Sequence, residues 1–240
     1  MSRRPRIVAL ADSLALPRDE KGEVLRWEET WPYLLAEQLA GVDVINCGAR
    51  ARSSDQLLGD ALYEHVALKR PDVVVVQVGI VDCSPRVFTK LEKRLLGLPV
   101  VPAPLRQRII AHRAARRAEI TRRDPLGRVH TPPADYARDV ARFAQEAGPL
   151  GARVVFLPVL SWPARMELKS PGHGGNVRLY NDLLRTAARE QGARFLEPEA
   201  LVPEAELERA FMADGYHLSA HGSRRVAEHL APELRSVLSA

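Results

Sequence analysis

The chain of 240 residues is 46% hydrophobic and 27% charged, a composition typical of one globular α/β domain. Its two cysteines, Cys47 and Cys83, are too few for a disulfide framework or a zinc site. No segment approaches the roughly 18 apolar residues of a membrane helix. The apolar run after the arginines near the start, residues 7–11, is too short for a signal peptide. We therefore expect a cytoplasmic protein that does not enter a membrane.

Apolar runs alternate with amphipathic stretches along the chain. The runs predict strands over 6–10, 42–46, 73–78, 153–158 and 194–197. Helical spacing predicts helices over 31–39, about 53–66, 134–147, 176–191 and 220–238. This alternation favours a five-stranded parallel sheet covered on both faces. In such sheets, ligands bind beyond the carboxyl ends of the strands.

One segment, at about 86–133, interrupts the alternation and predicts a helical, basic insertion after strand 3 of a single domain spanning 1–240. Between Arg86 and Arg128 it carries twelve Lys or Arg residues against three acidic ones, although the whole chain has a net charge of only +5. Residues 105–123 read as one helix. The insertion would form a lid, a homodimer arm or an anion-binding surface. Its helix presents either a solvated face, with Ile109, Ile110 and Ile120 packing inward, or a site for an anionic substrate. Nucleic acid is not expected, because interleaved aromatic residues and a recognised binding module are missing.

The first candidate for chemistry is Ser13, which follows the first predicted strand in Ala11-Asp12-Ser13-Leu14. A serine at a strand-to-helix junction lies near backbone N–H groups that can bind an oxyanion. The structural alternative is a helix N-cap or a turn residue.

The second candidate is the pair Asp214 and His217, which lie three residues apart between the last predicted strand and the last predicted helix. A serine nucleophile needs a base, and that base needs an acid to orient it. A tight turn would bring the Asp214 carboxylate to Nδ1 of His217 and leave Nε2 for Ser13. The alternative is a pair of polar loop residues beside a helix start.

The block Ala11-Asp12-Ser13 and the block Asp214-Gly215-Tyr216-His217, in this order, resemble the SGNH/GDSL hydrolase family. The resemblance implies a flavodoxin-like three-layer α/β/α sandwich. It implies Ser13 as nucleophile, His217 as base and Asp214 as the orienting acid, a mechanism that needs no cofactor. It also implies esterase or deacetylase activity, or O-acyl transfer to an acceptor alcohol through the same triad. Because His112, His130 and His173 show no ligand spacing, we expect no metal.

Two middle blocks of the family pattern also have counterparts. In Asn46-Cys47-Gly48-Ala49-Arg50-Ala51-Arg52, Ala51 takes the position of the glycine whose N–H helps to bind the oxyanion. In Gly79-Ile80-Val81-Asp82, the glycine and the aspartate match, but Val81 stands where the family has its oxyanion-binding asparagine. We therefore place Asp12, Ala51, Gly79, Val81 and Asp82 in the oxyanion and substrate-binding region.

The valine at position 81 leaves two hypotheses open. In the first, the chain is an enzyme and another residue, Arg50, Arg52 or Asn46, replaces the missing amide. A replacement would matter because loss of one oxyanion donor typically lowers the rate about 10²–10³-fold. Alternatively, the chain is a non-catalytic protein that binds a glycan or another anion on the same fold.

Some features point to the substrate. The first block continues to Pro17-Arg18, which, like the block at Gly79, resembles relatives associated with bacterial surface-polysaccharide assembly. There Pro17 and Arg18 would shape the entrance of the site. The expected partner is a small-molecule or carbohydrate acyl ester, anionic if the basic insertion contacts it. Residues 172–175 read as a flexible loop at the rim, with His173 either near the site or solvated.

Overall fold

The computed structural model describes residues 3–20, 22–160 and 163–239. Five parallel strands form the main sheet, in the order β4-β1-β5-β6-β7. Their bounds are β1 (Arg6–Ala11), β4 (Asp43–Asn46), β5 (Val73–Gln77), β6 (Arg153–Phe156) and β7 (Arg194–Phe195). Each of the five predicted strands is therefore present, and the last is two residues shorter than predicted.

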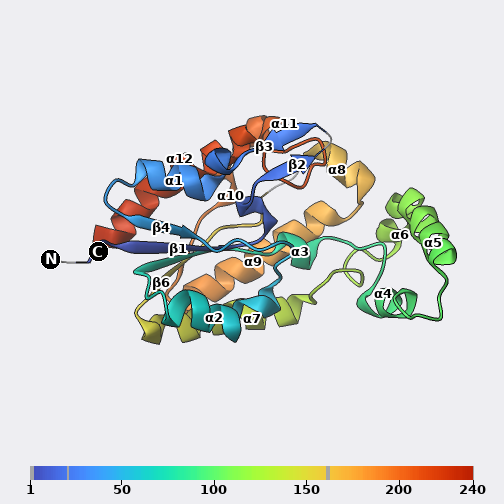
Figure 1. The fold of residues 1–240 in the computed structure, drawn as a ribbon, viewed down its shortest axis with the longest axis horizontal. Coiled ribbons are helices and arrows are strands. Elements are labelled where there is room, and N and C mark those ends of the chain that lie inside the picture. The colour runs from blue at the N-terminus through green and yellow to red at the C-terminus, as the bar shows by residue number, and fades with distance from the viewer. Residues whose placement is uncertain (1–2, 21, 161–162, 240) are drawn as a thin grey trace.

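Helices cover both faces of the sheet (Figure 1). One face packs against α1 (Trp31–Gln38) and α12 (Ala220–Ser239), and the other against α7 (Pro133–Ala147) and α9 (His173–Glu190). Alternate residues of β1 divide between the two cores, with Ile7 on the first face and Val8 on the second. This is the expected flavodoxin-like three-layer α/β/α sandwich. The strand order reverses between β1 and β5, which is where such sheets bind ligands.

Two local structures differ from the prediction. The helix expected over 53–66 is interrupted at Gly59, whose positive φ of 61° separates η3 (Ser54–Leu57) from α2 (Asp60–Leu62). Helix α2 continues directly into the π-helix η4 (Tyr63–Ala67). The antiparallel pair of β2 (Arg18–Glu20) and β3 (Glu23–Leu25) was not predicted, since each strand has three residues and neither shows an apolar alternation.

The basic segment forms a group of helices at the opposite end of the molecule from the two termini (Figure 1). Its helices are α4 (Lys90–Leu96), α5 (Ala103–Ala115) and α6 (Arg117–Arg123). The single helix predicted over 105–123 is wrong, because Arg116 leaves helical geometry between α5 and α6. The inward packing predicted for Ile110 is also wrong: its side chain is 45% exposed, and α5 has no buried residue.

Short elements complete the described chain. They are η1 (Ser13–Ala15), η2 (Trp27–Glu29), α3 (Ile80–Cys83), η5 (Gly148–Leu150), α8 (Ala164–Lys169), α10 (Pro198–Leu201), η6 (Glu204–Glu206) and α11 (Leu207–Ala210). Among the helices of the described residues, none has the length and apolar character required to cross a membrane.

Candidate active site

Ser13 lies directly beyond the carboxyl end of β1. The chain turns there because the N–H of Asp12 donates to the Gln77 carbonyl (2.9 Å) and the Asp12 carboxylate accepts from the N–H of Leu14 (2.9 Å). Asp12 therefore caps η1, and the alternative of Ser13 as an N-cap is wrong. Ser13 is left half-buried on the wall of a cavity of about 500 Å³, called here the Ser13 cavity.

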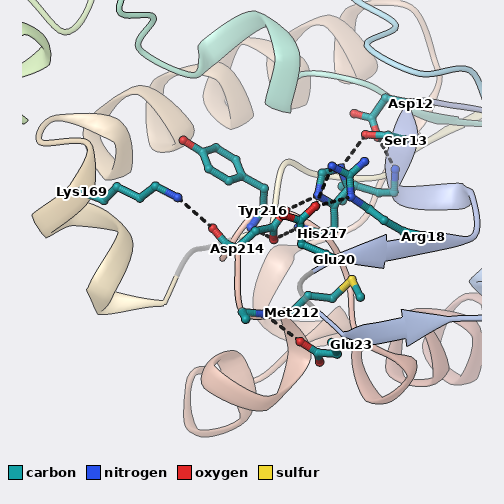
Figure 2. A network of polar contacts seen from close by, with 12 residues as sticks. Asp12, Ser13, Arg18, Glu20, Glu23, Lys169, Met212, Asp214, Tyr216 and His217 are labelled. Atoms are coloured by element: carbon teal, nitrogen blue, oxygen red, sulfur yellow. Dashed lines mark hydrogen bonds and ion pairs between the residues drawn. The ribbon is translucent and has the colours of Figure 1, made fainter. Parts of the chain in front are cut away.

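His217 and Asp214 reach the same cavity from the turn before α12. Nε2 of His217 lies 3.1 Å from Oγ of Ser13, and Nδ1 lies 2.5 Å from Oδ2 of Asp214 (Figure 2). The other carboxylate oxygen of Asp214 accepts from the N–H groups of Tyr216 (2.8 Å) and His217 (3.0 Å). Gly215 adopts a φ of 75°, and a Cβ there would meet Sδ of Met166 at 2.3 Å. The three predicted residues thus form one hydrogen-bonded chain.

The charge of Asp214 is stabilised by its neighbours. Burial favours the neutral acid, but hydrogen bonds from the His217 ring and from two backbone N–H groups outweigh it and lower the pKa of Asp214 to about 2. The carboxylate is consequently ionised at neutral pH. An ionised carboxylate holds a proton on Nδ1 and leaves Nε2 as an acceptor for the Ser13 hydroxyl.

Asp12 lies beneath the nucleophile position rather than in the cavity. Its side chain is buried, and burial is the main reason that its pKa rises from 3.8 to about 7. The N–H of Leu14 opposes this rise, and the nearby Asp82 adds to it. Oδ2 of Asp12 is buried without a hydrogen-bond partner among the described residues. Asp12 therefore positions η1.

The raised pKa of Asp12 predicts a pH-dependent stability. Between pH 4 and 7 the folded chain holds a proton that the unfolded chain has released. Its contribution is fully present below pH 4 and is lost as the pH rises towards 7, at up to about 1.4 kcal/mol per pH unit. Replacing Asp12 with Asn should make the decline in unfolding free energy over this window shallower, as measured by urea unfolding. The exposed Asp19→Asn is the control, and parallel curves for Asp12→Asn and wild type would contradict the assignment.

Ala51 occupies the predicted oxyanion position at the wall of the Ser13 cavity. Its φ of 57° is a left-handed conformation that glycine adopts without strain, so Ala51 keeps a glycine-like backbone. The N–H groups of Ser13 and Ala51 have no hydrogen-bond acceptor among the described residues. Two backbone donors are therefore available beside the Ser13 hydroxyl.

The block after β5 has one residue on the cavity wall and two residues behind it. Val81 lines the Ser13 cavity. Asp82 is buried away from it, where its carboxylate accepts from the N–H of Ser54 (3.0 Å) and from Oγ1 of Thr131 (2.6 Å). Burial raises the pKa of Asp82. Gly79 has a φ of 130°, and a Cβ would lie 2.4 Å from the Val159 side chain, so only glycine fits there. Asp82 and Gly79, which we placed in the oxyanion and substrate-binding region, therefore lie behind the cavity wall and support it.

Among the suggested replacements for the missing amide, only Arg50 lines the cavity. Arg52 is buried, and its guanidinium donates to the carbonyls of Ala11 (3.1 Å) and Cys47. Asn46 donates to the carbonyl of Ala15 (2.7 Å) and accepts from the N–H of Gly48 (2.8 Å). Arg52 and Asn46 therefore hold the loop in place, and neither side chain lines the cavity.

The cavity also has lining residues that were not singled out from the sequence as members of the site. Four of them are polar: Glu20, Ser84, Lys169 and Tyr216; two are arginines from the basic segment, Arg86 and Arg117. Arg18, expected at the entrance, also lines the cavity, whereas Pro17 is exposed outside it. The excess of basic residues was the available signal, but it did not distinguish the two arginines that reach the site from those that do not.

Residues 172–175 do not form the predicted flexible loop. His173 begins α9 and is 1% exposed, so it is neither at the rim nor solvated. Burial, together with the charges of Arg117 and Arg86, lowers the pKa of His173 to about 3, which leaves it neutral. Within residues 3–20, 22–160 and 163–239, no group of three or more His, Cys, Asp or Glu residues is arranged to hold a metal ion.

The fold of this chain has counterparts among solved structures. A comparison with curated protein sequences found no match. A lipase/acylhydrolase from Enterococcus faecalis is 17% identical, with a TM-score of 0.65 over 97% of this chain and 96% of that one. An acetylxylan esterase from Geobacillus stearothermophilus, solved as a catalytic mutant, is 16% identical, with a TM-score of 0.63 over 99% of this chain and 95% of that one. A carbohydrate acetylesterase from Sinorhizobium meliloti is 17% identical, with a TM-score of 0.58 over 97% of this chain and 99% of that one.

These likenesses show a shared fold. The family model described as the GDSL-like lipase/acylhydrolase family matches residues 12–225, which include every residue of the Ser13–His217–Asp214 chain. The chain therefore belongs to the GDSL-like lipase/acylhydrolase family.

Proposed function

We propose that this protein is a serine esterase that removes an acyl group from an acylated sugar. The hydrogen-bonded chain from Ser13 through His217 to Asp214, at the wall of an open cavity, carries the proposal. Membership of a hydrolase family supports the reaction class.

The proposed reaction has two halves. Oγ of Ser13 attacks the ester carbonyl carbon while Nε2 of His217 takes its proton, and Asp214 stabilises the imidazolium that forms. The tetrahedral intermediate then breaks its bond to the alcohol, which leaves with the proton from His217. Water attacks the acyl-serine in the same manner, with His217 again as base. The second tetrahedral intermediate breaks its bond to Oγ of Ser13, which takes the proton back from His217, and the carboxylic acid product leaves.

The oxyanion donors in this proposal are the N–H groups of Ser13 and Ala51. Both residues line the Ser13 cavity, and neither N–H is used elsewhere by the described residues. Val81 supplies no side-chain donor, so the hole would rest on the backbone. Preorganised N–H groups in a partly dry site stabilise charge that develops in the transition state.

A sugar ester is the proposed substrate class for two reasons. The acetylxylan esterase and the carbohydrate acetylesterase have the same fold as this chain over nearly its whole length. The blocks at Asp12 and Gly79 also resemble relatives associated with surface-polysaccharide assembly. The two free cysteines, Cys47 and Cys83, suit a reducing compartment, and on that ground we place the enzyme in the cytoplasm.

Residues 86–133 are, in this proposal, an insertion on a single domain spanning 1–240. They lie between β5 and α7, at the end of the molecule away from the termini (Figure 1). Their helices α4 and α5 have no buried residue, so they are too sparsely packed to form a core of their own.

The test is steady-state release of acetate from 4-nitrophenyl acetate and from acetylated xylose or glucose, with and without an excess of acceptor sugar. Hydrolysis that acceptors leave unchanged would support an esterase. Appearance of an acetylated acceptor, with less free acetate, would instead support an O-acyltransferase with the same triad. No turnover by the folded protein would favour a binding protein.

A third oxyanion donor should increase the rate. Because Val81 lines the Ser13 cavity, Val81→Asn places an amide where the family has one. Since removal of such a donor typically costs 10²–10³-fold, its addition is expected to raise kcat for 4-nitrophenyl acetate by about tenfold or more. Val81→Leu is the apolar control and should give no increase. A lower kcat for Val81→Asn would contradict an oxyanion hole next to position 81.

A further inference from the structure

Positive charge dominates the wall of the Ser13 cavity. Five basic residues line it, namely Arg18, Arg50, Arg86, Arg117 and Lys169, against two carboxylates, Glu20 and Asp214. Both carboxylates are engaged: Glu20 with Arg18 at 3.1 Å, and Asp214 with His217 at 2.5 Å. No carboxylate on the wall remains for Arg86 or Arg117, which come from the basic segment.

The hydrogen bonds that position Arg86 and Arg117 go to neutral groups. Nη2 of Arg86 donates to the carbonyl of Val81 (2.7 Å). Nη2 of Arg117 donates to Oη of Tyr216 (2.6 Å), and more weakly to the Pro85 carbonyl and the Ser170 hydroxyl. Nε of each arginine is buried without an acceptor among the described residues. The two guanidinium groups are thus oriented by neutral acceptors, and neither forms an ion pair with a carboxylate of the described residues.

The charge of Arg117 acts unfavourably on Arg86. The pKa of Arg86 is lowered mainly by burial, and the positive charge of Arg117 adds to this decrease, while Tyr216, Cys83 and Asp82 oppose it. Partly buried charges without a counter-charge are costly, and a planar guanidinium fork suits a carboxylate or a phosphate. An anion between the two groups would supply the missing counter-charge and accept hydrogen bonds from both.

Arg117 contacts the turn that carries Asp214 and His217. Tyr216 lies between Asp214 and His217 in sequence, and its hydroxyl accepts from Arg117. Nζ of Lys169 donates to the Asp214 carbonyl (3.4 Å) and lies 5.1 Å from the centre of the Tyr216 ring (Figure 2). The cationic wall and Ser13 therefore face one ligand-sized space.

We propose that the ester substrate carries an anionic group, a carboxylate or a phosphate, that binds Arg86 and Arg117 while its ester carbonyl lies at Ser13. The inference rests on the proposed function, whose chemistry it extends with a substrate class. The anion belongs either to the acyl part or to the sugar alcohol.

Equilibrium binding tests the anion site separately from catalysis. The Ser13→Ala protein is titrated calorimetrically with two matched pairs: glucose 6-phosphate against glucose, and monomethyl succinate against methyl butyrate. At least one anionic member should bind tenfold or more tightly than its neutral counterpart. Preference within the first pair assigns the anion to the alcohol, and preference within the second assigns it to the acyl group.

Three further variants identify the groups responsible. Adding Arg117→Gln or Arg86→Gln should reduce affinity for the preferred anion by about 30-fold or more, as expected for loss of a partly buried charge partner. Arg117→Lys keeps the charge but loses the fork, and it should weaken binding by less. The control is Arg122→Gln on α6, an exposed arginine outside the cavity, which should leave binding unchanged.

Equal binding of charged and neutral members would overturn the inference, as would a preference that survives both glutamine variants. Labelling of Ser13 in the wild-type protein by a fluorophosphonate reports the proposed function independently. Labelling without anion preference would leave the serine chemistry standing without the anion site. Anion binding without labelling would support the anion site and contradict the proposed serine chemistry.

Discussion

Replacing Ser13 with alanine is expected to lower kcat/KM for 4-nitrophenyl acetate by about 10⁴–10⁶-fold. The variant loses the atom that attacks the carbonyl, whereas His217, Asp214 and the backbone donors stay in place. The half-buried hydroxyl has little structural role, so the melting temperature should change by less than about 4 °C.

The matched control for Ser13→Ala is Ser236→Ala, an exposed serine on α12 that does not line the Ser13 cavity. It should retain wild-type kinetics. If Ser13→Ala kept more than a tenth of the activity while folded, Ser13 would not be the nucleophile.

Replacing Asp214 with asparagine should lower kcat/KM by about 10³–10⁴-fold. The side-chain oxygen of Asn can still accept from the N–H groups of Tyr216 and His217, so the turn is expected to persist. The amide that then faces Nδ1 of His217 favours the wrong tautomer, which turns a proton rather than a lone pair towards Ser13. Stopped-flow assays and the melting temperature separate this effect from unfolding.

A second carboxylate–histidine pair serves as the control for Asp214. Oε2 of Glu206 lies 2.7 Å from Nε2 of His221, outside the Ser13 cavity. Glu206→Gln should leave kcat/KM within about twofold of wild type. Equal losses in Asp214→Asn and Glu206→Gln would mean that both act through folding rather than through the base.

The sheet and the candidate triad were largely accessible from sequence. Residues 73–77 are β-branched apart from Gln77, which identifies a central strand. In a parallel sheet, ligands bind beyond the carboxyl ends of the strands, and Ser13 lies there, beyond β1, within hydrogen-bonding distance of His217. The spacing of Asp214 and His217 predicted their contact, since a tight turn leaves few other geometries.

The missed features depend on contacts that no local pattern encodes. From the sequence, the side chain of Arg52 could extend into the cavity, but its guanidinium instead donates hydrogen bonds to two backbone carbonyls. Arg86 and Arg117 are 31 residues apart, and they line the same cavity as Tyr216 only because the chain between β5 and α7 folds back over the site. The antiparallel pair of β2 and β3 lacks apolar alternation, so tertiary packing rather than propensity determines it.

Covalent labelling tests the central claim most directly. The wild-type protein, Ser13→Ala and His217→Ala are each incubated with a fluorophosphonate, and the intact masses are recorded. We predict one adduct on the wild-type protein and none on either variant, because only a serine hydroxyl activated by His217 attacks phosphorus at a useful rate. Wild-type protein that stays unlabelled while folded, or an adduct that persists on Ser13→Ala, would contradict the account.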